Sequence, residues 1–322
     1  MRGANYVLKR TAFALVTIFL AITLNFVIFR AAPGDAASSL RNCRNCPAVV
    51  KEQLRKELGL DKSKLEQYGI YLRDLAQADL GDSFVSREPV ANELASGLKN
   101  TLPMLLLATF IAVGFGTLAG VIAAWRRGTA LEWANVSISL FFYSMPTQWL
   151  GLMLILFFAG TLPVAGISDP FLEFTDPSVW EVFVDRMRHM ILPSVTLGLV
   201  LYGQYALIAR SSILQTLGED YILTARAKGL GNWMIVWRHA LRNALLPIVS
   251  LMALEVAYLA GGAILVEAVF SYPGIGLQVY EAVFDRDYPM LQGAFLVITV
   301  GVVFVNLLAD LLYFKLDPRI AT

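Results

Sequence analysis

The chain has 322 residues, of which 57% are hydrophobic and 16% are charged, and its mean hydropathy is +0.61. The apolar share is far above that of soluble domains and the charged share is below it, so the composition predicts an integral membrane protein. The formal net charge of +1 excludes a general nucleic-acid binder, which needs a strongly basic face.

The first predicted element is an apolar run over residues 11–29 that follows Arg2, Lys9 and Arg10. The run is longer than the hydrophobic core of a signal peptide, so we expect a retained transmembrane helix. Ala31 and Ala32 are small residues of the kind found at cleavage sites, and a cleaved signal is the alternative.

Residues 30–99 predict a small helical domain rather than a linker. Apolar residues recur every three or four positions over 50–58 and 65–75, which is typical of two amphipathic helices. Pro89 marks the start of a third helix that leads into the next apolar run. Lys and Arg are balanced by Asp and Glu in this segment, and long segments cross the membrane largely regardless of charge. We therefore expect an extracytoplasmic domain.

Six apolar runs have the length of about 20 residues that a bilayer requires. The predicted fold is an all-α integral membrane protein with six transmembrane helices, and Lys and Arg in its short connections set the orientation. Arg126 and Arg127 follow the second run, and Lys315 and Arg319 follow the last. Both termini are therefore expected in the cytoplasm. The six runs are 11–29, 101–124, 136–160, 190–209, 244–270 and 291–314.

Small and helix-breaking residues predict where the spans pack closely or bend. Gly116 and Gly120 form a small-xxx-small face in the second span, which favours close helix packing. Pro146 interrupts the third span, and Gly261 with Gly262 loosens the fifth, so we expect both spans to bend around a cavity.

Glu255 is a candidate pathway residue because its position in the fifth span places it near the middle of the hydrocarbon. An acid at that depth needs a partner or water. It either lines a cavity and meets a cationic solute, or it accepts a structural hydrogen bond from Gln204, Tyr202 or Tyr205. Glu267 is nearer the outer interface, where a structural role is expected.

Cys43 and Cys46 form a C-x2-C pair in the segment that we place outside, where oxidation is permitted. A closed zinc site lacks ligands, because no second pair and no nearby histidine accompany them. A disulfide-closed loop is the first interpretation, two free thiols are the second and a redox function is the third.

The sequence contains no HExxH, no GxSxG and no P-loop, so the chain itself is predicted to be non-catalytic and to bind no ATP through a Walker motif. We expect no metal site. A proton-coupled secondary transporter is a separate hypothesis, because Glu255 and Asp310 are plausible protonation sites and inverted repeats escape inspection by eye.

A polar, basic segment lies between the fourth and fifth runs, over residues 219–247. Glu219 and Asp220 open it and Lys228 with Gly229 closes its first part, so charge and a glycine stop predict a short helix. Its small residues, among them Ala225, allow a backbone to approach a groove on another protein. From these residues alone the segment is either a docking helix or an ordinary solvated loop.

Several motifs, in order along the chain, closely resemble the permease subunits of ATP-binding cassette (ABC) importers in the dipeptide/oligopeptide/nickel family. The likeness covers most of the chain and points to the first of the two permeases that such importers pair. It rests on LGLD at 58–61, DLGDS at 79–83, HMILPSVTLGL at 189–199, ARAKGL at 225–230, RHALRNALLP at 238–247, VEAVFSYPGIG at 266–276, RDYPMLQG at 286–293 and LDPRI at 316–320.

The resemblance implies a type I importer permease fold in a bacterial inner membrane. Residues 1–29 would form the N-terminal segment and first helix, residues 30–99 the outer domain, and residues 100–322 a five-helix core with a cytoplasmic coupling loop at about 210–243. The implied partners are a second homologous permease, two cytoplasmic subunits that bind ATP and Mg, an extracytoplasmic peptide-binding protein and the bilayer. The coupling residues implied are Glu219, Asp220, Tyr221, Ala225, Lys228 and Gly229, and a peptide's ammonium would give Glu255 a role beside Gln204 and Tyr205.

The sequence departs from the family pattern in three places. The general importer signature opens with glutamate, but Leu223 stands six residues before Gly229, so an ion pair from that glutamate is not transferred. Leu246 and Pro247 close the signature later than in sugar importers. The segment with Cys43 and Cys46 has no counterpart that we associate with the family.

Overall fold

The computed structural model describes residues 2–31, 49 and 61–316, and every named element in these residues is a helix. The Cys43–Cys46 pair and the helix predicted over 50–58 lie outside the described residues. Two compact units share the chain: residues 1–99 with 277–322 form unit 1, and residues 100–276 form unit 2.

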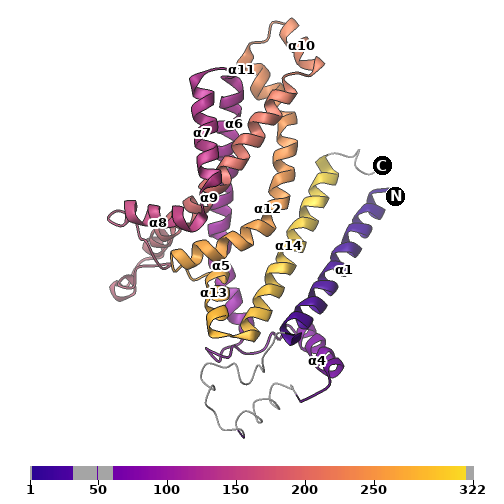
Figure 1. The fold of residues 1–322 in the computed structure, drawn as a ribbon, viewed down its shortest axis with the longest axis vertical. Helices are drawn as coiled ribbons and strands as arrows, with labels where there is room; N and C mark the ends of the chain where they lie inside the picture. Colours follow the sequence, from indigo (N-terminus) through magenta and orange to yellow (C-terminus); the bar gives the residue numbers. More distant parts are fainter. Residues whose placement is uncertain (1, 32–48, 50–60, 317–322) are drawn as a thin grey trace. The chain divides into compact units, whose positions relative to one another are not determined.

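Unit 1 is built on two long apolar helices, α1 (Arg2–Ala31) and α14 (Tyr288–Leu316), which run side by side (Figure 1). They are antiparallel, because Arg10 near the start of α1 forms a 3.0 Å ion pair with Asp310 near the end of α14. The short helix α4 (Lys64–Ala76) was predicted from its apolar spacing and is capped by Ser63. Phe26 of α1 stacks on Tyr71 of α4.

In unit 1, the buried carboxylate of Asp287 joins the start of α14 to the loop before α5. Asp287 accepts hydrogen bonds from Ser83 Oγ at 2.5 Å, Val85 N at 3.3 Å and Met290 N at 3.2 Å, so it caps α14 and holds the loop before α5. Gly293 on α14 lies so close to this region that an added Cβ would be 2.7 Å from Val90 Cγ1. The motifs at 79–83 and 286–293 are therefore two halves of one junction.

Unit 2 is organised around α9 (Val179–Thr216), a 38-residue helix that begins with a capping box formed by Ser178 and Glu181. The elements that pack against α9 include the π-helical segment η2 (Ile111–Phe115), α6 (Gly116–Trp125), α7 (Ala130–Ser144), α8 (Thr147–Phe158) and α12 (Leu241–Val269). The helix α5 (Val90–Phe110), which leads into η2, contacts α9 where Ser194 Oγ donates to the carbonyl oxygen of Met104 at 3.1 Å.

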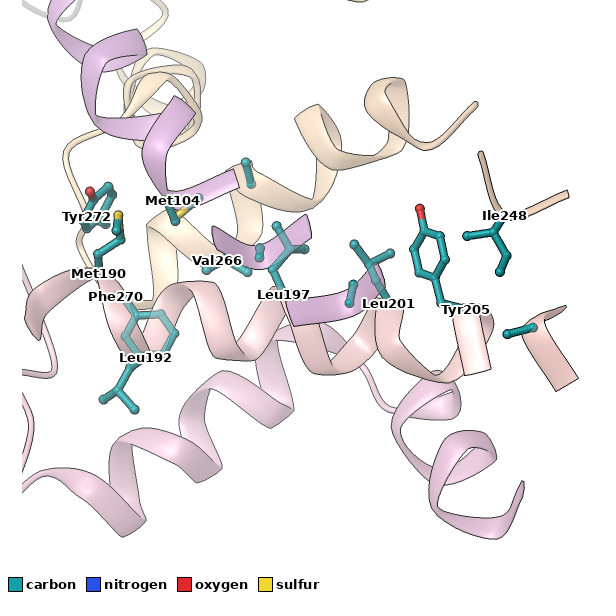
Figure 2. Packing of buried hydrophobic residues seen from close by; sticks show 14 residues of the cluster. Met104, Met190, Leu192, Leu197, Leu201, Tyr205, Ile248, Val266, Phe270 and Tyr272 are labelled. Carbon is teal, nitrogen blue, oxygen red and sulfur yellow. The ribbon is translucent and has the colours of Figure 1, made fainter. Parts of the chain in front are cut away.

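Small residues let α6 approach the backbone of α9, as the glycine spacing predicted. A Cβ added at Gly116 would lie 2.7 Å from Tyr205 Cβ and 2.8 Å from the carbonyl oxygen of Tyr202. Gly120 meets the carbonyl of Ala206 in the same way. Figure 2 shows the apolar side chains that fill the adjacent core, including Leu197, Leu201, Tyr205, Ile248, Val266 and Phe270.

The predicted third span is broken at Pro146. The chain leaves α7 at Ser144 and re-enters a helix at Thr147, and the axes of α7 and α8 differ by 106°. By contrast, α12 remains one helix through Gly261 and Gly262, although its axis changes direction along its length (Figure 1). Within the described residues, four helical spans are long and apolar enough to cross a membrane, and α7 with α8 makes a fifth if this bent pair is one span.

Short helical elements complete the fold of the described residues. η3 (Leu172–Thr175) precedes α9, α11 (Asn232–Met234) runs into the π-helical segment η4 (Ile235–Ala240), and α13 (Ile275–Asp285) precedes α14. The polar segment between α9 and α12 contains one more helix, α10 (Asp220–Ala227).

Candidate functional site

The polar segment forms the short helix that its charges and glycine predicted. Glu219 is the N-cap of α10, Asp220 lies in the first turn, and Arg226 lies in the last. Each charge therefore interacts favourably with the end of the helix dipole that it faces. Gly229 ends the helix with a φ of +77°, a left-handed conformation that favours glycine. Its amide donates to the carbonyl oxygen of Arg226 at 2.9 Å.

The inner side of α10 rests on the protein's own core. Ile222 has no exposed surface, and Ala225 is 5% exposed. Both pack in a cluster that includes the ends of α6, α9 and α12, so α10 is supported by three long helices. The other buried members are Val121, Ala124, Ile213, Ile235, Val236, Ala240 and Ala244. Ala225 therefore contacts the chain itself, and its predicted contribution to docking would be indirect.

The outer side of the same segment carries large apolar side chains. Tyr221 is 40% exposed, Leu223 57%, Trp233 56% and Met234 45%. We call these four residues the apolar loop surface. Tyr221 is held in place because Asn243 Nδ2 donates to its hydroxyl at 2.7 Å. Of the other predicted coupling residues, Glu219, Asp220, Lys228 and Gly229 are exposed.

Leu223, Trp233 and Met234 were not predicted as site residues. Leu223 was noted only as the replacement of a glutamate, and it stands beside the buried Ile222, so the sequence alone does not separate an exposed from a buried position. Trp233 also has a structural contact, since its ring centroid lies 5.2 Å from that of Trp125 at the end of α6 and 5.0 Å from that of Trp237.

A second feature missed from the sequence is the ion pair between Glu132 and Arg210. Glu132 in the first turn of α7 accepts from Arg210 Nε of α9 at 2.8 Å and also contacts Arg210 Nη2. Its other oxygen accepts from Gly128 N at 2.6 Å. These bonds fix the turn between α6 and α7 to α9 beside the apolar cluster.

The predicted pathway residues lie on two helices. Tyr205 is 1% exposed and belongs to the core of unit 2, while Gln204 is half-buried on the same helix. Glu255 is the central residue of the 29-residue helix α12. Its side chain is outside the described set, so its contact with α9 stays a prediction.

Glu267 has the structural surroundings that its position suggested. Its side chain is fully buried near the end of α12 and accepts a 2.6 Å hydrogen bond from Thr101 Oγ1. The same hydroxyl accepts from Ile275 N at 3.0 Å, which fixes the turn after α12. In that turn, burial and then the Glu267 charge raise the pKa of Tyr272 to about 12. The neutral phenol donates to Asn100 O at 3.3 Å.

The described residues contain no group of three or more His, Cys, Asp or Glu placed to hold a metal ion. Their arrangement defines a helical, multi-span membrane protein with an exposed helix held on the ends of its spans.

The chain belongs to the family of binding-protein-dependent transport system inner membrane components. The family's model matches residues 116–322, and the model of its N-terminal part matches residues 4–105. The chain is therefore the permease component of an ABC importer and a multi-pass protein of the bacterial inner membrane. It is non-catalytic and binds no cofactor itself, and ATP hydrolysis belongs to partner ATPases. Family membership does not favour the secondary-transporter hypothesis.

Curated relatives match over nearly the whole chain. The dipeptide transport system permease protein DppB of Escherichia coli (strain K12) is 39% identical over 334 residues, which cover 98% of each chain. The di/tripeptide transport system permease protein DppB of Pseudomonas aeruginosa (strain UCBPP-PA14) is 37% identical over 330 residues, with the same coverage. The glutathione transport system permease protein GsiC of Escherichia coli (strain K12) is 37% identical over 319 residues, again 98% of each chain.

A solved structure supports the fold. An inward-facing conformation of the MetNI methionine ABC transporter matches 71% of this chain and 96% of its own, with a TM-score of 0.51 and 21% sequence identity. At this identity the likeness speaks for the permease fold alone.

Proposed function

We propose that this chain is the first of two permease subunits of an importer for dipeptides or oligopeptides, and that α10 docks on an ATPase subunit. The observation that carries the docking proposal is α10 itself. Its inner side is buried against three spans, and its exposed Tyr221 and Leu223 form the apolar loop surface together with Trp233 and Met234 of α11. An exposed apolar patch on a short polar loop is typical of a protein interaction site.

The support under α10 explains how docking would act on the membrane spans. Ile222 and Ala225 are packed against residues of α6, α9 and α12 with little free surface. Packed interiors transmit displacement because they resist compression. A movement of the ATPase that shifts α10 would therefore shift the ends of these three helices together.

The topology that accompanies this proposal has six spans with both termini in the cytoplasm. The four spans above, the bent pair of α7 and α8, and the 29-residue helix α12 would together make six. The antiparallel pairing of α1 with α14 supports termini on one side. Residues 30–99 would then be extracytoplasmic, and a binding protein would deliver substrate there. Cys43 and Cys46 would form a disulfide, which predicts a mass gain of two hydrogen atoms on reduction.

The peptide substrate is proposed from the relatives, whose names specify dipeptide, di/tripeptide and glutathione transport. Glu255 would meet the peptide's ammonium, with Gln204 and Tyr205 nearby in the pathway. An acid at the centre of a span is costly without such a role or a local partner. A second permease subunit, two ATPase subunits and a peptide-binding protein would complete the assembly.

Leu223→Lys tests the docking proposal in the assembled importer, because glutamate at this position would recreate the general importer signature. Covering a leucine contributes up to about 3 kcal/mol, so removing it and adding a positive charge should weaken ATPase association by roughly tenfold or more. Phe174→Lys is the matched control, because Phe174 is 86% exposed but lies in η3 before α9. We expect co-purification of the ATPase to fall only with Leu223→Lys. Equal recovery from both variants, with both folded, would refute docking through this surface.

A further inference from the structure

A pocket of about 370 Å³ lies beside α10, where α6 and α9 end. Its walls come from unit 2: the end of α6 with the turn after it, the end of α9 with the residues after it, α10, α11 and η4. The lining residues are Ala124, Trp125, Arg127, Leu214, Leu217, Gly218, Arg226, Asn232, Ile235 and Val236. This volume is within the range of small-ligand sites.

The lining combines apolar side chains from α6, α9 and η4 with two cations and no carboxylate. Arg127 and Arg226 are both exposed, and neither forms an ion pair with any described residue. The nearby acid Glu132 is already bonded to Arg210 and to Gly128 N. A guanidinium binds phosphate oxygens with two parallel hydrogen bonds, so this pair of arginines suits a phosphate group.

The place of the pocket favours a phosphate carried by a lipid. The apolar helical span Val90–Trp125 ends at the pocket wall, and the span Val179–Thr216 ends beside it. Trp125 stands at that end with Arg126 over its ring at 4.5 Å, a combination typical of a membrane–water interface. Basic pockets between transmembrane helices at such an interface bind anionic headgroups.

We propose that this pocket binds the phosphate of an anionic phospholipid, with Arg127 and Arg226 on the phosphate and the apolar wall against the glycerol and first acyl carbons. The lipid would bridge the end of α6 to α10. This inference concerns a site that neither the transport pathway nor the docking surface uses, and it does not depend on which solute is transported.

Lipid retention by the assembled importer tests the proposal. The complex is reconstituted in phosphatidylcholine nanodiscs with and without phosphatidylglycerol, extracted and analysed by native mass spectrometry. We expect the wild type to retain phosphatidylglycerol, and the double variant Arg127→Gln/Arg226→Gln to retain it at least about tenfold less. Arg238→Gln/Arg242→Gln removes the same charge from exposed positions outside the pocket and should behave as the wild type.

A second variant separates the site from general charge. Leu217→Trp fills the pocket without altering charge, and it should also reduce retention while leaving the melting temperature near that of the wild type. Equal retention by the wild type and both pocket variants would overturn the proposal. Displacement by millimolar inorganic phosphate with no preference for phosphatidylglycerol would assign the site to free phosphate. Lost ATPase association with unchanged lipid retention would assign the arginines to the ATPase. Both outcomes would overturn the lipid assignment.

Discussion

Gly116→Ala should destabilise the protein strongly, whereas Gly114→Ala, two residues earlier, should not. At Gly116 the new methyl group would lie 2.7 Å from Tyr205 Cβ and 2.8 Å from Tyr202 O, and the second of these is backbone. At Gly114 nothing lies within 4 Å of the added carbon. The two substitutions have the same chemistry, but Gly114 lies in the π-helical segment η2 and its methyl group would meet nothing, whereas Gly116 begins α6 and its methyl group would meet α9.

The expected size of the difference follows from overpacking and from helix propensity. Overpacking in a close-packed interior costs about 1–3 kcal/mol. Replacing a helical glycine by alanine in open space gains about 0.5–1 kcal/mol. This gain is common to both variants, so they should differ in unfolding free energy by roughly the overpacking cost of 1–3 kcal/mol, which for 322 residues corresponds to a melting-temperature difference of about 1–5 °C.

Thermal unfolding of the detergent-purified protein, followed by tryptophan fluorescence, measures this difference. A lower melting temperature for Gly116→Ala alone would support the close packing of α6 on α9. Equal melting temperatures would refute it, and with it the argument that these helices move as one body under α10.

Three further predictions concern named side chains. Thr101→Val should lower the melting temperature, because it removes a hydroxyl that bonds to both Glu267 and Ile275 N, and each lost buried bond costs about 1–3 kcal/mol. Thr101→Ser keeps the hydroxyl and should largely retain stability. An equal loss of stability in both variants would contradict this account. Asp287→Ala should lower the unfolding free energy by about 1–3 kcal/mol, because it removes the cap of α14 and the acceptor of Ser83 and Val85 N. Protease cleavage within residues 79–89 should therefore accelerate. Unchanged cleavage would count against the junction. Glu255→Gln should lower peptide uptake while co-purification of the ATPase stays unchanged, and an unaltered uptake rate would favour a purely structural role.

Helix positions were predictable because apolar runs of bilayer length leave a strong signal in the sequence. The run predicted over 244–270 is the helix Leu241–Val269, and the run predicted over 291–314 is Tyr288–Leu316. The helix predicted from the fourth run, 190–209, is shorter than the observed helix α9, which extends from Val179 to Thr216. The extra turns contain polar residues, which lower the hydropathy on which the prediction was based. The π-helical segment Ile111–Phe115 has no apolar pattern that separates it from an α-helix.

Side-chain partners were not predictable, because they join residues far apart in the chain. Ser83 and Asp287 are separated by 204 positions, and Glu132 and Arg210 by 78. The family resemblance identified the motifs at 79–83 and 286–293 but not that they meet. For the candidate docking helix, charge and glycine predicted the local fold of α10. Which side chains face outward depends on packing against α6, α9 and α12, and this left Leu223 unrecognised.

The central claim is that α10 contacts an ATPase subunit, and site-specific photo-crosslinking tests it most directly. A photoreactive amino acid replaces Leu223 in the importer assembled in its membrane, and a second preparation carries it at Phe174. The account predicts an adduct with the ATPase from position 223 and none from position 174. No ATPase adduct from position 223, in an importer that still transports, would contradict the claim.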